Sequence, residues 1–244
     1  MSLTESEPSG RFKPWRGRAW IQLLAAVIGV LPLYSSLIVY QLRRDQSVSI
    51  QGFAFYLAVI APVAVVIALL LLRLLCGEKP RDLNLKPGKL PSDLLATLIL
   101  VPVIIVANVI SNRFLSELIP DSTSNTSVRD LFVKLASNPG LLVLFLGLLI
   151  PLGAISEEVI RVFLLSRVWK AWPSTAGKFV TVIISACLFG LIHVYRGPVS
   201  VAWTAIFGLI MALYYLRFGR VVPLILAHYL TNAFHVVVFA VLAR

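Results

Sequence analysis

The residues of this chain that could carry out chemistry lie inside long apolar segments of its second half. Two carboxylates, an arginine, two histidines and a carboxamide occur in the stretches PLGAISEEVIRVFLLSR, ACLFGLIHVYRG and LILAHYLTNAFH. Ionisable groups inside apolar segments of this kind are costly and indicate a functional site by default. The candidates are Glu157, Glu158, Arg161, His193, His228 and Asn232.

Glu157 and Glu158 are adjacent, so on a helix their carboxylates point about 100° apart and cannot share one pocket equally. Arg161 follows them at the i+4 and i+3 spacings at which helix side chains meet. A pairing would partly neutralise one carboxylate and leave the other free for chemistry. An ion pair that only locks two helices, or marks a membrane boundary, fits the same spacing.

The histidines have neighbours at one-turn spacing. Phe189 precedes His193 by four residues, and Asn232 follows His228 by four, so each pair shares a helix face. His193 could equally be a histidine near a helix end, satisfied by lipid headgroups or by a carbonyl. His228 and Asn232 could equally be hydrogen-bonding residues between helices. His235, seven residues after His228, is interpreted as structural.

The candidates lie at similar depths in their segments. Counted at about 1.5 Å per residue from the basic residue at one end of each segment, Glu157, His193 and His228 agree to within about 10 Å. A glutamate and a histidine can deprotonate a water, and a second histidine with an asparagine can hydrogen-bond an oxyanion. This is a set for amide hydrolysis without a covalent intermediate. Zn²⁺ ligation is the alternative, but the chain has no HExxH motif, so we expect no cofactor.

These residues are set in a strongly apolar chain. Of its 244 residues 59% are hydrophobic and 14% are charged, and the mean hydropathy is +0.90. Soluble domains are about 45–50% apolar and about 25% charged, so an ordinary soluble enzyme, a disordered chain and a disulfide scaffold are excluded. Seven segments have the length of a membrane-spanning helix: 19–41, 52–75, 93–112, 140–166, 178–195, 198–216 and 221–243.

The sequence therefore predicts an all-α, polytopic transmembrane helical bundle of seven to eight helices. The eighth would arise if 140–166 splits or kinks at Pro151 and Gly153. Residues 1–18 form a flexible basic cytoplasmic tail, 19–139 the first helices with an interfacial segment, and 140–244 the helical core that carries the candidates. The interfacial segment, 113–139, becomes amphipathic through Leu131, Phe132 and Leu135.

The formal net charge of +11 has a topological explanation. Most Lys and Arg residues fall on one side of the bilayer if the N-terminus is cytoplasmic and the C-terminus lies outside. We therefore interpret the charge as topology and contact with anionic lipid, with no nucleic acid partner. The expected location is an integral, multi-pass protein of the plasma (inner) membrane if the source is bacterial.

Three motifs in order, EE…R, FxxxH and HxxxN, resemble the CPBP intramembrane protease family. That family contains the type II CAAX prenyl endopeptidases and bacterial relatives linked to bacteriocin immunity. The resemblance covers about residues 140–240, and FGLIH (189–193) and HYLTN (228–232) match the family pattern directly. It implies an endopeptidase of the glutamate type that cleaves a membrane-associated protein or peptide, with prenylated proteins among the candidates.

The resemblance also implies a role for each residue. Glu157 with His193 would activate water, while His228 and Asn232 would stabilise the oxyanion. Glu158 and Arg161 would support the site, and Phe189 would pack beneath His193.

The first motif departs from the family pattern, EExxxR followed by glycine. Here Arg161 comes one residue early and no glycine follows. Either one position is deleted, or Glu157 takes the place of the second glutamate and Ser156 that of the first.

Two other functions fit the sequence. One is a non-catalytic immunity or scaffold protein of the same fold. The other is a metal- or haem-binding membrane protein that uses His193, His228 and His235, which would show stoichiometric metal or a Soret band.

Overall fold

The computed structural model describes residues 18–42, 49–83, 85, 88–119, 131 and 133–242. Apart from Arg18, the predicted tail of residues 1–18 lies outside this range. The described residues form an all-α bundle, as predicted, and contain no β-strand.

Long helices coincide with all seven predicted segments. Five of them are single helices: α1 (Ala19–Leu42), α4 (Leu90–Leu118), α8 (Thr175–Leu191), α9 (Pro198–Phe218) and α10 (Val222–Leu242). The second predicted segment is one continuous helix made of α2 (Ile50–Phe55), η1 (Tyr56–Ile60) and α3 (Ala61–Leu74). The fourth is one continuous helix made of α6 (Pro139–Leu144), η3 (Phe145–Leu149) and α7 (Ile150–Ala171). Short 3₁₀ turns lie at η2 (Pro80–Leu83) and η4 (Val194–Arg196).

Two prolines are accommodated by π turns. The π turn η1 ends two residues before Pro62, and η3 ends two residues before Pro151. A proline has no N–H and its ring crowds the carbonyl one turn earlier, and a wider turn there relieves both problems. The predicted kink or split near Pro151 is therefore a π turn within one continuous helix.

The predicted interfacial segment differs from its expected form. Residues 113–118 continue α4, and 120–130 and Phe132 lie outside the described residues. Leu131 and Leu135 are buried in a cluster with Phe145 and Leu149. The protein itself thus covers Leu131 and Leu135, and the interfacial placement of the segment stays a prediction.

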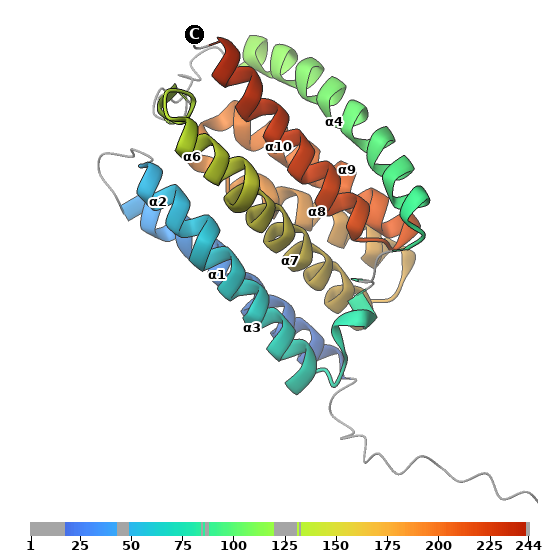
Figure 1. The fold of residues 1–244 in the computed structure, drawn as a ribbon. Helices are drawn as coiled ribbons and strands as arrows, with labels where there is room; N and C mark the ends of the chain where they lie inside the picture. Colours follow the sequence, from blue (N-terminus) through green and yellow to red (C-terminus); the bar gives the residue numbers. More distant parts are fainter. Residues whose placement is uncertain are drawn as a thin grey trace, which may run out of the picture.

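Helix α7 lies in the middle of the bundle (Figure 1). It packs on α1 and α3 on one side and on α8, α9 and α10 on the other, while α4 packs against α9 and α10. This position explains why its side chains from Ser156 to Leu165 are all buried, the two glutamates and the arginine included. The functional candidates of α7 therefore face protein and not lipid.

The outer faces of the helices are apolar. Leu98, Ile110 and Val143 are each more than 60% exposed, as expected of side chains that contact lipid. Among the described residues, four helices are long and apolar enough to cross a membrane: Ile50–Leu74, Leu90–Leu118, Pro139–Ala171 and Pro198–Phe218. Shorter apolar helices cover Ala19–Ser35, Thr175–Leu191 and Val222–Val238. The fold is that of a helical membrane bundle.

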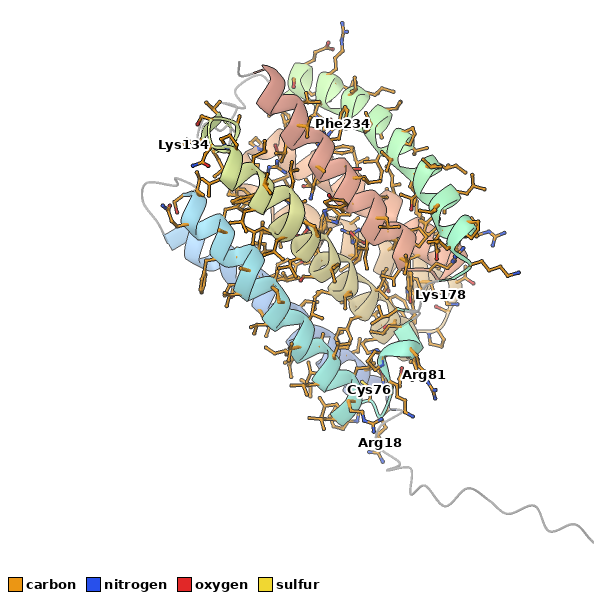
Figure 2. The ribbon with its side chains drawn as sticks, viewed as in Figure 1. Arg18, Cys76, Arg81, Lys134, Lys178 and Phe234 are labelled. Carbon is orange, nitrogen blue, oxygen red and sulfur yellow. The ribbon has the colours of Figure 1, made fainter. Side chains whose placement is uncertain are left out.

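Basic residues assigned to the cytoplasmic side lie at one end of this bundle. Arg18, Arg81 and Lys178 are found toward one end, while Lys134 lies at the opposite end (Figure 2). The labelled residues that were assigned to one side of the bilayer thus share one end of the bundle, and the cytoplasmic location of that end stays a prediction.

A buried ion cluster ties α7 to its neighbours at the same end. The guanidinium of Arg167 is fully buried and donates from Nη1 and Nη2 to the two carboxylate oxygens of Glu78, each at 2.7 Å. It also donates to Gln22 of α1 at 2.9 Å, and Lys170 lies 2.7 Å from Glu78. Burial alone would raise the pKa of the Glu78 carboxyl, but the bonds from Arg167 and Lys170 outweigh it and lower the pKa.

Helices α8 and α9 approach closely at Gly190, which gives a prediction about stability. A Cβ atom at Gly190 would lie 2.7 Å from the backbone carbonyl oxygen of Val201 and 2.9 Å from the Ala205 side chain. Because a backbone atom cannot turn aside, we expect Gly190→Ala to destabilise the protein by about 1–3 kcal/mol. The measurement is unfolding of the purified protein in detergent, followed by helical circular dichroism.

Gly147→Ala is the matched control. Nothing lies within 4 Å of a Cβ atom at Gly147. Alanine there is expected to be neutral or to stabilise by up to about 1 kcal/mol, because it restricts the unfolded chain. Equal losses for the two variants would contradict the close packing at Gly190.

Candidate active site

Glu158 is fully buried, and both of its carboxylate oxygens have partners. Oε1 lies 2.7 Å from Nδ1 of His228, and Oε2 lies 3.0 Å from Nη1 of Arg161. The predicted pairing of Arg161 with one of the two adjacent glutamates is thus confirmed, and the paired one is Glu158. The His228 contact also fixes the distance between α7 and α10.

Glu157 is the less committed carboxylate. It is about 9% exposed, and its Oε2 lies 3.7 Å from Nε2 of His228, which is too long for a hydrogen bond. Its side chain lines a small cavity together with residues of α1, α7 and α8. The lining residues are Val30, Leu33, Tyr34, Glu157, Ile160, Arg161, Leu164, Ser185, Phe189 and Ile192.

Arg161 faces the same cavity with part of its guanidinium. Its side chain is 2% exposed, and Nη1 is held by Glu158. The flat face of the group lies over the Phe189 ring at 4.0 Å from the centroid, a cation–π geometry. Nε and Nη2 are buried and have no hydrogen-bond partner.

His193 lies just beyond the C-terminus of α8. Its backbone (φ −102°, ψ 14°) is in the bridge region, which active-site residues often adopt. Nδ1 lies 2.9 Å from the carbonyl oxygen of Phe189, which can only accept, so Nδ1 carries a hydrogen. In the neutral ring Nε2 is then an acceptor. No hydrogen bond or ion pair joins His193 to Glu157 or Glu158 in the described structure.

Phe189 connects these groups. Its ring centroid lies 4.9 Å from that of His193 and 5.9 Å from that of His228. It therefore packs against both imidazoles and under Arg161, which extends the role implied for it. Phe207 stacks on Phe189 at 5.7 Å and meets the His228 ring edge-on at 4.8 Å.

Asn232 and His235 stand farther from the carboxylates. Asn232 is partly exposed, one turn along α10 from His228, and its amide forms no hydrogen bond with another described residue. His235 has a ring contact with Phe234 at 5.9 Å and no ring or ionic contact with His193 or His228. The described residues include no group of three His, Cys, Asp or Glu side chains placed to hold a metal ion.

The sequence did not point to three residues of this site. Tyr34 and Ser185 line the cavity, and Phe207 packs against the His228 ring. Each occurs in an apolar helix as an ordinary tyrosine, serine or phenylalanine, and no spacing distinguishes it. Only the packing of α1, α8 and α9 around α7 brings them to the site.

Comparison with protein families bears on the same part of the chain. A family model described as type II CAAX prenyl endopeptidase Rce1-like matches residues 139–234. The predicted resemblance is confirmed. The Rce1-like segment runs from the start of α6 into α10 and contains both glutamates, Arg161, Phe189, His193, His228 and Asn232. No curated protein and no solved structure gives a significant match to the chain.

The Rce1-like segment covers less than half of the chain, and one wall of the cavity lies outside it. Val30, Leu33 and Tyr34 belong to α1, which the family model does not match. The matched family is one of proteases that act on membrane-associated proteins. Together with the apolar helices, it supports an integral membrane protease.

Proposed function

We propose that this protein is a multi-pass intramembrane endopeptidase that hydrolyses a peptide bond with a water activated by Glu157. The observation that carries the proposal is the unequal use of the two glutamates. Both oxygens of Glu158 are occupied by His228 and Arg161, whereas Glu157 lines the cavity and has no short polar contact. Glu157 is therefore the carboxylate available to accept a proton, and Glu158 is a positioning residue.

The catalytic step follows from the acceptors near the cavity. A water can donate one hydrogen to Glu157 and the other to Nε2 of His193, which leaves a lone pair for the substrate carbonyl carbon. As the C–O bond forms, Glu157 takes the proton. Glu157 then gives this proton to the amide nitrogen as the C–N bond breaks, and it returns to the ionised state.

The oxyanion formed in this step needs hydrogen-bond donors. We assign that role to His228 and Asn232, as the resemblance implies. The Asn232 amide has no other described partner, and Nε2 of His228 faces the side of Glu157. Glu158 accepts a hydrogen bond from Nδ1 of this ring and so sets its orientation. His228 therefore acts as a donor to the oxyanion in the form that also carries a hydrogen on Nε2.

The substrate class follows from the setting of the site. Apolar side chains of Val30, Leu33 and Leu164 line the cavity, which suits a membrane-associated protein or peptide. Prenylated proteins are candidates because the matched family is described as a type II CAAX prenyl endopeptidase. The test is a comparison of peptides released in the native membrane by wild-type protein and by Glu157→Gln and Glu158→Gln variants. The protease proposal fails if the peptides and the biological activity are unchanged in these variants and in His193→Ala.

A glutamate mechanism also predicts the response to metal removal. We expect hydrolysis to retain its rate after dialysis against EDTA and 1,10-phenanthroline, because the proposed base is a carboxylate and the nucleophile an unligated water. Initial rates on one peptide before and after chelation provide the measurement. Loss of activity that returns on addition of Zn²⁺ would replace this proposal with the zinc alternative.

A further inference from the structure

We propose that Arg161 is a catalytic residue whose Nε–H and Nη2–H groups bind the carbonyl oxygen of the bond to be cleaved. This inference rests on the proposed function and adds a second set of donors for the oxyanion, from α7. It assigns to Arg161 a direct contact with the reacting atoms, beyond the support of Glu158.

The guanidinium is fixed in place by contacts that leave one edge free. Nη1 is held by Glu158 at 3.0 Å, and the Phe189 ring covers the flat face at 4.0 Å. The remaining nitrogens, Nε and Nη2, form the edge from which arginine donates two parallel hydrogen bonds to oxygen. These two are the guanidinium nitrogens that are buried without a partner.

A buried charged donor without a partner costs free energy, so an occupant of the cavity is expected at this edge. Arg161 and Glu157 line the same cavity. An oxygen acceptor that meets the arginine edge is therefore close to the carboxylate proposed to activate water. A base and an electrophile beside one small cavity are the two groups that a carbonyl addition requires.

The charges of the site favour a carbonyl oxygen over a carboxylate as the occupant. Two carboxylates, Glu157 and Glu158, already lie beside Arg161, and a carboxylate occupant would add another negative charge in a buried place. A substrate carbonyl adds none. When Glu157 takes the proton of water, the negative charge moves from Glu157 to the carbonyl oxygen, and the total charge of the site does not change.

The arginine edge thus meets the negative charge where it develops. His228 and Asn232, the donors proposed above, stand on α10, and Arg161 adds a charged donor from α7. Tyr34 and Ser185 line the cavity as well, but their hydroxyls carry no charge to offset an oxyanion.

The experiment compares Arg161→Lys with Arg167→Lys in reconstituted vesicles. Both are buried arginines of α7 that pair with a glutamate, but only Arg161 lines the cavity. We expect Arg161→Lys to lower kcat by about 10²–10³, the cost of a lost oxyanion donor, with KM changed less than threefold. Arg167→Lys should leave kcat within about twofold of wild type.

A peptide aldehyde and its alcohol separate this role from structural damage. The aldehyde adds water to give a tetrahedral centre whose oxygen takes the place of the oxyanion, whereas the alcohol does not. In Arg161→Lys the affinity for the aldehyde should fall by the same factor as kcat/KM, and the affinity for the alcohol should hold. Equal loss for both inhibitors would overturn the inference, since damage to the site weakens both.

Peptides with a free or an amidated C-terminus complete the test. Arg161→Lys should lower kcat by the same factor for both kinds of peptide. A rise in KM confined to the free acids would show that the arginine edge binds a carboxylate and would overturn the inference. If Glu157→Gln were active, the proposed function would fail. If Glu157→Gln were inactive and Arg161→Lys normal, only the role of Arg161 would fail.

Discussion

Replacing Glu157 with glutamine is expected to lower kcat for peptide hydrolysis by about 10²–10⁴, the usual contribution of a general base. Glutamine has nearly the same size but cannot accept the proton of the attacking water. Glu157 makes no short polar contact, so the substitution breaks no hydrogen bond and the fold should survive. The measurement is single-turnover cleavage of a membrane-anchored peptide by purified protein in vesicles.

Two further variants serve as controls for this prediction. Glu117→Gln alters an exposed carboxylate of α4, whose side chain is 71% exposed, and should leave kcat unchanged. Glu158→Gln leaves the buried charge of Arg161 without its carboxylate partner and should reduce both stability and kcat. If Glu158→Gln were folded and inactive while Glu157→Gln kept its rate, the assignment of the two glutamates would be reversed.

The sequence was sufficient to predict the number and approximate limits of the long helices, because length and hydropathy determine which segments can cross a bilayer. It was less informative at their ends. Helix α4 continues to Leu118, into the segment 113–139 that was predicted to be interfacial. Helix α8 ends at Leu191, so His193 lies in a turn and not on the helix.

The sequence predicted which residues belong to the site, but it did not predict which of them contact one another. Depth along a helix follows from residue count, so three motifs at similar depth could be expected to meet. Rotation of each helix about its axis depends on packing that one sequence does not reveal. This is why His228 meets Glu158 directly, while the proposed Glu157–His193 pair requires a bridging water.

The early arginine of the first motif has a physical explanation in this geometry. At the i+3 position Arg161 reaches Glu158 on its own helix and lies over Phe189 of α8. Nε and Nη2 of this guanidinium stay without a hydrogen-bond partner, and the Arg161 side chain lines the cavity beside Glu157. The departure from the family pattern is therefore compatible with an active site that uses Glu157, and this stays a prediction until the variants are measured.

Removal of Arg167 is expected to cause the largest loss of stability at the end of the bundle where α7 meets Glu78. Arg167→Ala leaves Glu78 with one side of its carboxylate unpaired and removes the hydrogen bond from Arg167 to Gln22. Breaking a buried pair by removing one partner costs about 3–5 kcal/mol. Thermal or denaturant unfolding in detergent at neutral pH provides the measurement.

The exposed pair of Arg113 and Glu117 is the matched control for Arg167→Ala. Its side chains are 86% and 71% exposed, so Arg113→Ala should cost about 0–1 kcal/mol.

The double variant Glu78→Gln/Arg167→Met removes both charges of the buried pair and should recover much of the loss. Because the pKa of Glu78 is lowered in the folded protein, the pair stabilises fully above the pKa of the unfolded carboxyl. This stabilisation is lost as the pH falls through the folded value. A double variant as unstable as Arg167→Ala would show that the loss does not come from the unpaired charge of Glu78.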